Sequence, residues 1–164
     1  MDAPPLLDEA TADFIAGPTA SIAIASRDDT NHASLFKAVA CRVSADRRRV
    51  TLYVDQQLAR AVVAQLRAGF PVAAVFSEPA THRTIQLKGE RAELGPVAPA
   101  DREHARVHFE ALVEHLVALD YPEDGVRCYF HYTPEQLIAI AFEPGTAFEQ
   151  TPGAGAGNPL GSAA

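Results

Sequence analysis

Positively charged side chains stand at positions where they could together hold an anion. Lys37 lies in an apolar, strand-like run, Arg60 in the first turns of a helical segment, and Arg83 and Lys88 in a later strand-like run. The helical segment begins near Gln56, and the amino end of a helix favours an anion. Each cation alone is typical of a protein surface. Together they indicate an anion site beside a small β-barrel.

Three histidines follow one another on a single stripe of the helix expected over residues 99–119. His104, His108 and His115 are spaced i, i+4 and i+11, which places them on nearly the same side of the helix. Histidines at i and i+4 suit a helical zinc site, but the metalloprotease motif needs a glutamate where Ala105 stands. We interpret the stripe as a solvated flank, with a metal site as the lesser alternative.

The two cysteines give no sign of a disulfide or of a nucleophile. Cys41 stands in the middle of an apolar run, where a thiol is normally inert. Cys128 is followed by His131, and in the strand expected there these side chains would point to opposite faces. We expect both thiols to be free and buried, in a reducing compartment. No catalytic residue is assigned.

Glycine-rich phosphate-binding loops are missing from the sequence. No Walker-type loop occurs, and no Gly-x-Gly-x-x-Gly stands between a strand and a helix. The glycines of residues 152–157 precede no helix, so we interpret them as part of a flexible tail. The alternative is that backbone N–H groups of this stretch line an anion.

The composition excludes several classes of protein. The chain has 164 residues, 48% of them apolar, as expected for one globular domain. A net charge of −7 argues against a nucleic-acid-binding face. No apolar run approaches the roughly 20 residues that span a bilayer, and the acidic amino end is unlike a signal peptide. We expect a cytoplasmic protein with no nucleic-acid or membrane partner.

Short strand-like runs with short connections dominate the chain. Apolar patterning predicts strands over residues 20–26, 34–44, 50–55, 71–77, 83–94, 126–132 and 137–142. Helices are expected over residues 56–68 and 99–119, with a helical turn or two over residues 8–16. Arg47, Arg48 and Arg49 would form the tip of a hairpin between two strands.

The order of these elements favours an antiparallel fold. Most strands follow one another directly, whereas a doubly wound parallel sheet needs strict alternation of strands and helices. We predict a mainly β fold, a small antiparallel split β-barrel of about six to seven strands flanked by helices. Residues 1–18 would form a leader, residues 19–148 the barrel domain, and residues 149–164 a tail rich in glycine, alanine and proline.

Three short motifs in the expected strands resemble those of a known family. They are Phe36-Lys37, Leu52-Tyr53-Val54-Asp55, and the run from Arg83 to Glu90. With the order of elements over residues 10–145, these motifs resemble the pyridoxamine 5′-phosphate oxidase-like FMN-binding split-barrel family. The closing residues 148–153 also look like the ending of some small members.

The resemblance implies a homodimeric, FMN-dependent oxidoreductase with the flavin at the subunit interface, and it does not identify a substrate. By position, Lys37 and Arg60 would hold the phosphate, and Val54 and Asp55 would lie along the ribityl chain or the ring. Thr84 and Gln86 would meet the flavin from one side. The full set of expected cofactor-binding residues is Phe36, Lys37, Tyr53, Val54, Asp55, Arg60, Arg83, Thr84 and Gln86.

Some positions depart from the pattern of the oxidase itself. His32 stands where the oxidase has an arginine, and Arg60 is a single cation where it has an adjacent Arg-Lys pair. Asp55 places a negative charge near the expected phosphate. One alternative is a non-enzymatic module that binds haem or another planar ligand, with His32, His82 and His131 as candidate ligands. Another is a cofactor-free dimer, and a deazaflavin could replace FMN.

Overall fold

Two antiparallel sheets form the framework of the chain, and the computed structural model describes residues 4–161 of it. The larger sheet has the strand order β10-β9-β6-β5-β1-β2. Its six strands are β1 (Ser21–Arg27), β2 (Ala33–Ala38), β5 (Val72–Ser77), β6 (Thr84–Gly89), β9 (Thr146–Glu149) and β10 (Pro159–Leu160).

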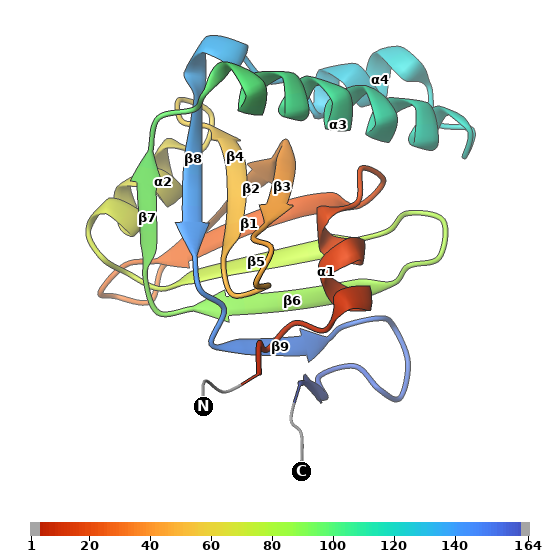
Figure 1. Cartoon of the computed structure of the whole chain (residues 1–164). Coiled ribbons are helices and arrows are strands. Elements are labelled where there is room, and N and C mark those ends of the chain that lie inside the picture. Colours follow the sequence, from red (N-terminus) through yellow and green to blue (C-terminus); the bar gives the residue numbers. More distant parts are fainter. Residues whose placement is uncertain (1–3, 162–164) are drawn as a thin grey trace.

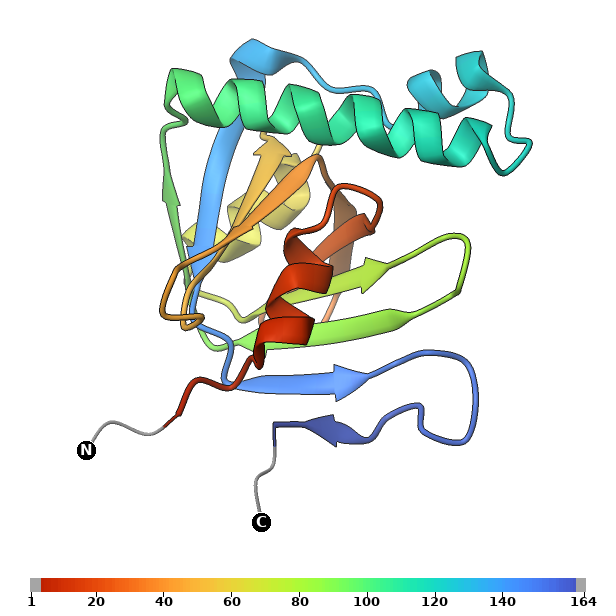
Figure 2. The same ribbon diagram turned by 45° about the vertical axis from the view of Figure 1, so that its right-hand side comes forward.

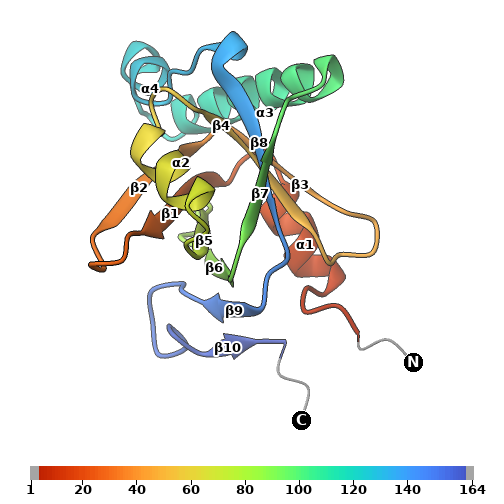
Figure 3. The same ribbon diagram turned by 90° about the vertical axis from the view of Figure 1, so that its left-hand side faces the viewer.

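The smaller sheet has the strand order β3-β4-β8-β7 and crosses in front of the larger one (Figure 1). Its strands are β3 (Ala40–Val43), β4 (Val50–Asp55), β7 (Ala92–Gly95) and β8 (Leu137–Phe142). Figure 3 shows the two sheets from the side, with β1 and β2 on one flank and β3 with helix α1 on the other. The predicted antiparallel split barrel is confirmed, with ten strands among the described residues instead of six to seven.

The hydrophobic core lies between the two sheets. In β1, Ile22 and Ile24 are buried while their neighbours along the strand are half-exposed, as expected for a strand with one buried face. Phe76 of β5 and Leu87 of β6 belong to the same core cluster as Phe142 of β8. The opposite face of the larger sheet, here called the outer face, carries small and polar side chains.

Two of the predicted strands are broken where the chain passes from one sheet to the other. The run over residues 34–44 ends its pairing with β1 at Ala38, and Val39 then donates its N–H to the carbonyl oxygen of Tyr53. The run over residues 83–94 breaks after Gly89. A Cβ at Gly89 would lie 2.8 Å from Phe142 Cδ2, so the close approach of β6 to β8 needs glycine.

The predicted short helix near the amino end is confirmed as α1 (Glu9–Ala16). The Asp8 side chain caps it by accepting a hydrogen bond from the Thr11 N–H at 2.7 Å. Leu7 and Ile15 are fully buried in the main core. The segment expected to be a leader therefore contributes to the barrel core.

Three further α-helices follow, and one of them corrects a predicted strand. Helix α2 (Arg60–Arg67) is shorter than the expected helix, and α3 (Pro99–Val117) agrees with its expected range. The strand predicted over residues 126–132 is wrong, because residues 126–129 belong to α4 (Glu123–Tyr129), which is followed by the 3₁₀ turn η1 (Pro134–Gln136). The Arg127 side chain binds Glu123 one turn earlier and Glu110 on α3, which holds this segment as a helix against α3.

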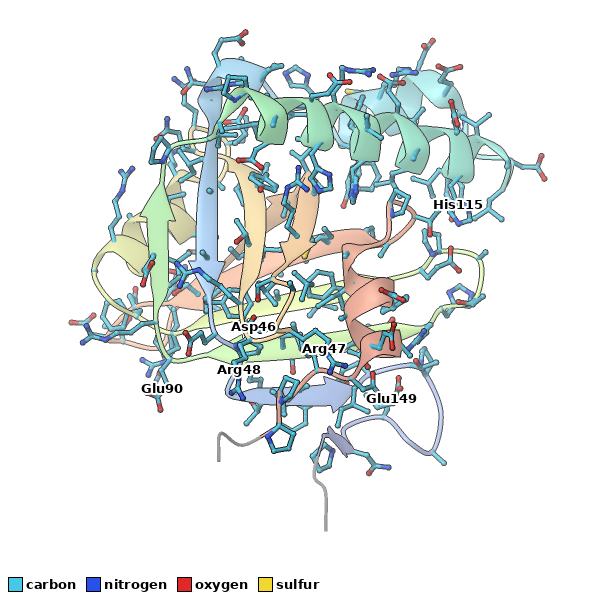
Figure 4. All side chains as sticks on the ribbon, in the orientation of Figure 1. Asp46, Arg47, Arg48, Glu90, His115 and Glu149 are labelled. Atoms are coloured by element: carbon cyan, nitrogen blue, oxygen red, sulfur yellow. The ribbon has the colours of Figure 1, made fainter. Side chains whose placement is uncertain are left out.

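The carboxyl-terminal segment is held to the larger sheet. Strands β9 and β10 pair with each other, and the Gln150 N–H donates to the Thr84 carbonyl oxygen at 2.8 Å. The glycine-rich stretch forms the loop between these strands, and Gly157 there adopts a φ of 89°. The arginine-rich segment is a hairpin tip between β3 and β4, as predicted (Figure 4). Within residues 4–161, none of the helices combines the length and apolar character that a membrane crossing requires.

Candidate functional site

A cavity of about 600 Å³ opens between the outer face of the larger sheet and the pair of helices α3 and α4. We call it the hairpin cavity. Figure 2 shows these helices above the strands, with the turn between β5 and β6 reaching out beneath them. Ligand pockets typically measure about 300–1,000 Å³, so the cavity has the size of a cofactor or small-molecule site.

Hydroxyl groups from three neighbouring strands form one side of the hairpin cavity. Ser21, Ser77 and Thr84 lie opposite one another on β1, β5 and β6. The Ser21 hydroxyl donates to the Ser77 carbonyl oxygen at 3.3 Å, and the hydroxyl oxygens of Ser77 and Thr84 are 3.1 Å apart. A hydroxyl can both donate and accept, so this row can meet either kind of polar atom on a ligand.

Aromatic and apolar side chains form the opposite side. Tyr129 and Phe130, at the end of α4, contact each other edge to face with ring centroids 4.9 Å apart. Tyr121, Val126 and Leu116 extend this wall along α3 and α4. The sequence did not point to these residues because the segment was expected to be a strand. The adjacent aromatic residues Tyr129 and Phe130 are the sequence feature that could have indicated an aromatic wall.

A contact between His115 and Glu78 closes one edge of the cavity. His115 lies on the side of α3 that faces the β5–β6 turn, and its Nε2 atom contacts the carboxylate of Glu78 (Figure 4). Burial raises the pKa of Glu78, but hydrogen bonds from Ala80, Thr81 and His115 outweigh it and hold the pKa below its usual value. The pair ties α3 to the turn and so fixes the distance between the two sides of the cavity.

Lys37, which the family resemblance places at the phosphate, contacts the end of α4 in this structure. Its ammonium donates to the Tyr129 carbonyl oxygen and lies 3.7 Å from the centroid of the Tyr129 ring. The rings of Phe36 and Phe130 are 5.4 and 5.5 Å away, so three aromatic faces surround the charge. Burial lowers the pKa of Lys37. Lys37 therefore lies behind the aromatic wall of the hairpin cavity.

Asp55 acts as a structural cap. Its side chain is 2% exposed and accepts hydrogen bonds from three backbone N–H groups, those of Gln57 and Leu58 at 3.0 Å and of Thr133 at 2.9 Å. Phe36, Lys37 and Asp55 do converge on one pocket, but its volume is only about 10 Å³. That volume holds one water molecule at most, so no cofactor enters between these residues in this structure.

The remaining predicted residues are distributed over the barrel. The Tyr53 hydroxyl donates to Asp101 Oδ1 at 2.8 Å beneath α3, and Val54 is buried in the core. Arg60 is exposed at the start of α2. Arg83 is exposed, with its guanidinium 4.2 Å from the Phe14 ring centroid, and Gln86 lies on the outer face. Thr84 is the predicted site residue that lines the hairpin cavity.

The histidine stripe of α3 faces the sheets and is not a solvated flank. His104 Nε2 lies 2.9 Å from the Cys41 carbonyl oxygen, and the ring centroids of His104 and His108 are 4.1 Å apart. Burial, followed by the nearby charges of His104 and Arg42, lowers the pKa of His108 to about 4. No group of three His, Cys, Asp or Glu side chains within residues 4–161 could hold a metal ion.

The two thiols differ in exposure, contrary to the expectation that both are buried. Cys41 is fully buried, and burial raises the pKa of its thiol well above the usual value. Cys128 is exposed, because residue 128 lies on the outward side of α4 instead of in a strand.

The hairpin cavity has the size and lining for a flat ring, and its described lining offers no cationic side chain of lysine or arginine for a phosphate. The aromatic wall and the hydroxyl row match a flat ring with polar atoms on its edge. The described lining residues include no lysine or arginine. Glu78 and His82 are the lining residues that can carry a charge.

Comparison with known proteins identifies the fold. No protein-family model matches the sequence, and no curated protein matches it. Solved structures do match. A candidate pyridoxamine 5′-phosphate oxidase from Lactobacillus delbrueckii has a TM-score of 0.54 and 11% identity, covering 90% of this chain and 97% of its own. The fold is that of the pyridoxamine 5′-phosphate oxidase-like split barrel.

Two further solved structures share this fold. HupZ from Group A Streptococcus has a TM-score of 0.54 and 12% identity, covering 92% of this chain and 99% of its own. An F420 reductase has a TM-score of 0.54 and 10% identity, and the match covers 86% of this chain and 98% of the reductase chain. At identities this low, the likeness establishes the fold alone.

Proposed function

We propose that this protein is a flavin-dependent oxidoreductase that binds the isoalloxazine ring of a flavin such as FMN in the hairpin cavity. The observation that carries the proposal is the cavity itself, about 600 Å³ between an aromatic wall and a row of hydroxyl groups. The fold adds support, since an F420 reductase and a candidate pyridoxamine 5′-phosphate oxidase share it. A fold hosts many functions, so the site carries more weight than the likeness.

The chain's own residues would bind and orient the ring. A bound flavin supplies the hydride chemistry, and the protein supplies position, hydrogen bonds and a dry environment. Ser21, Ser77 and Thr84 would hydrogen-bond the polar edge of the ring, while Tyr129 and Phe130 would contact its face. Leu116 and Val126 would exclude water from this side. No side chain is assigned as an acid or base.

We further propose that the protein is a homodimer in which a second copy covers the outer face. Ala23, Ala25, Ala73 and Val75 give this face small, half-exposed side chains, and Leu35 beside them is 68% exposed. The four longer strands, β1, β2, β5 and β6, lie about 4.8 Å apart and have about six residues each, so they span roughly 14 Å by 20 Å. That is about a third of the roughly 800 Å² that each partner contributes to a stable interface.

The absorbance spectrum of freshly purified protein, together with its mass in solution, tests both proposals. A flavin spectrum, or saturable quenching of flavin fluorescence by the cofactor-free protein, is expected in a particle of twice the chain mass. No flavin spectrum and no saturable binding would reject the flavoenzyme. A Soret band would favour the haem-binding alternative, for which His82 in the cavity lining is the candidate ligand.

A further inference from the structure

The polar groups of the hairpin cavity are uncharged except at one edge. Ser21, Ser77 and Thr84 present hydroxyls on β1, β5 and β6. At that edge Glu78, whose pKa is held below the usual value, lies in contact with His115, and His82 lines the cavity as well. A phosphate carries about two negative charges near neutral pH, and a neighbouring carboxylate repels it. The cavity therefore disfavours a phosphate and accommodates a neutral polar edge.

The nearest cations are occupied by other partners. Lys37 is bound to the Tyr129 carbonyl oxygen and enclosed by aromatic rings. The Arg127 guanidinium binds Glu110 and Glu123, and Arg83, next to Thr84 in sequence, lies over the Phe14 ring. None of these three residues lines the cavity in the described structure. In the described structure each of these cations has its contacts outside the cavity lining.

We infer that the hairpin cavity recognises a flat heteroaromatic ring with an uncharged polar edge, and that a phosphate on the ligand contributes nothing to its binding. The inference rests on the proposed flavin-binding function and narrows its ligand class. Riboflavin and FMN carry the same ring and differ by one phosphate, so they should bind equally well. The same cavity would admit a deazaflavin ring.

If charged side chains held the phosphate, FMN would bind much more tightly than riboflavin. Each hydrogen bond between a charged side chain and a phosphate strengthens binding by roughly tenfold to a hundredfold. Two such bonds, from Lys37 and Arg60 as the family resemblance implies, would make FMN bind at least a hundredfold more tightly than riboflavin. Phosphate contacts of this kind would also weaken steeply with salt.

The experiment is a titration of the full-length, cofactor-free protein with riboflavin and with FMN, followed by flavin fluorescence at 50 and 500 mM NaCl. We expect the two dissociation constants to agree within about threefold and to change by less than about threefold with salt. The Lys37→Met and Arg60→Gln variants should keep the same ratio of the two constants. FMN binding more than thirtyfold tighter than riboflavin would overturn the inference while leaving the flavoprotein proposal intact. Binding of neither flavin would reject both.

Discussion

Replacing His108 should remove a defined part of the acid sensitivity of this protein. His108 lies on the inner side of α3 and is 8% exposed, and its ring centroid is 4.1 Å from that of His104, with the two rings tilted by 51°. Burial is the main cause that lowers its pKa from 6.5 to about 4. The unfolded chain takes up the proton near pH 6.5, whereas the folded chain resists it until about pH 4. The contribution of His108 to the free energy of unfolding is therefore fully present above pH 6.5 and is lost as the pH falls toward 4.

The expected loss follows from these two pKa values. Between pH 7.5 and pH 5.5, the difference in proton uptake lowers the free energy of unfolding by about 1.3 kcal/mol. Most aspartate and glutamate side chains titrate below this window. Measurements between pH 5.5 and pH 7.5 therefore separate the effect of histidines on the free energy of unfolding from that of the carboxylates.

Urea denaturation at pH 7.5 and at pH 5.5, followed by circular dichroism, measures the effect. The His108→Leu variant should lose about 1.3 kcal/mol less between the two pH values than the wild type. The His32→Gln variant, which replaces an exposed histidine, is measured in parallel as the control. If His108→Leu kept the full pH dependence, the buried position of His108 beneath α3 would be wrong.

Three further substitutions test other parts of the structure. Asp55→Ala removes the acceptor of three backbone N–H groups. Urea denaturation should show a free energy of unfolding lower by about 3 kcal/mol, and a loss below about 1 kcal/mol would contradict the capping role of Asp55. Gly89→Ala places a Cβ 2.8 Å from Phe142 and should cost about 1–3 kcal/mol, and an unchanged melting temperature would refute the close approach. Lys37→Met removes the contacts with Tyr129 and should increase amide hydrogen exchange at the end of α4, which unaltered exchange would contradict.

Local patterns predicted most of the elements but not where the chain changes sheet. The short helix expected over residues 8–16 and the long helix expected over residues 99–119 depend on nearby residues, and both agree with the structure. The break after Ala38 does not interrupt the apolar pattern, because both sheets bury the same kind of side chain. The break after Gly89 falls where the polar residues Glu90 and Arg91 follow the glycine. The pairing of distant strands fixes where each break lies.

The helix α4 shows how tertiary contacts override local preference. Residues 126–132 are rich in β-branched and aromatic side chains, which favours a strand. Arg127 instead binds Glu123 one turn earlier and Glu110 on α3, and Val126 packs against Leu112 and Leu116. The ion pair with Glu110 spans 17 residues, so a short window of sequence did not show it.

The same helix explains why the sequence located only part of the candidate site. Thr84 was identified from its strand motif and lines the hairpin cavity. The aromatic wall was missed along with the helix that carries it. The contact between Lys37 and Tyr129 joins residues 92 positions apart, so a short window of sequence does not show it.

Filling the hairpin cavity tests the central claim that a flavin ring binds there. Gly125 lines the cavity from α4, and a Cβ added to it would meet nothing closer than Pro122 Cγ at 3.5 Å. The Gly125→Phe variant can therefore carry a ring into the cavity. Val107→Phe, on an exposed position of α3 outside the cavity lining, is the matched control. Circular dichroism would establish that both variants fold.

The decisive measurement is the dissociation constant of FMN for these two variants and the wild type, by fluorescence titration under one set of conditions. We expect Gly125→Phe to weaken FMN binding at least tenfold and Val107→Phe to leave it within about twofold of the wild type. Wild-type affinity in a folded Gly125→Phe protein would contradict the placement of the flavin ring in the hairpin cavity.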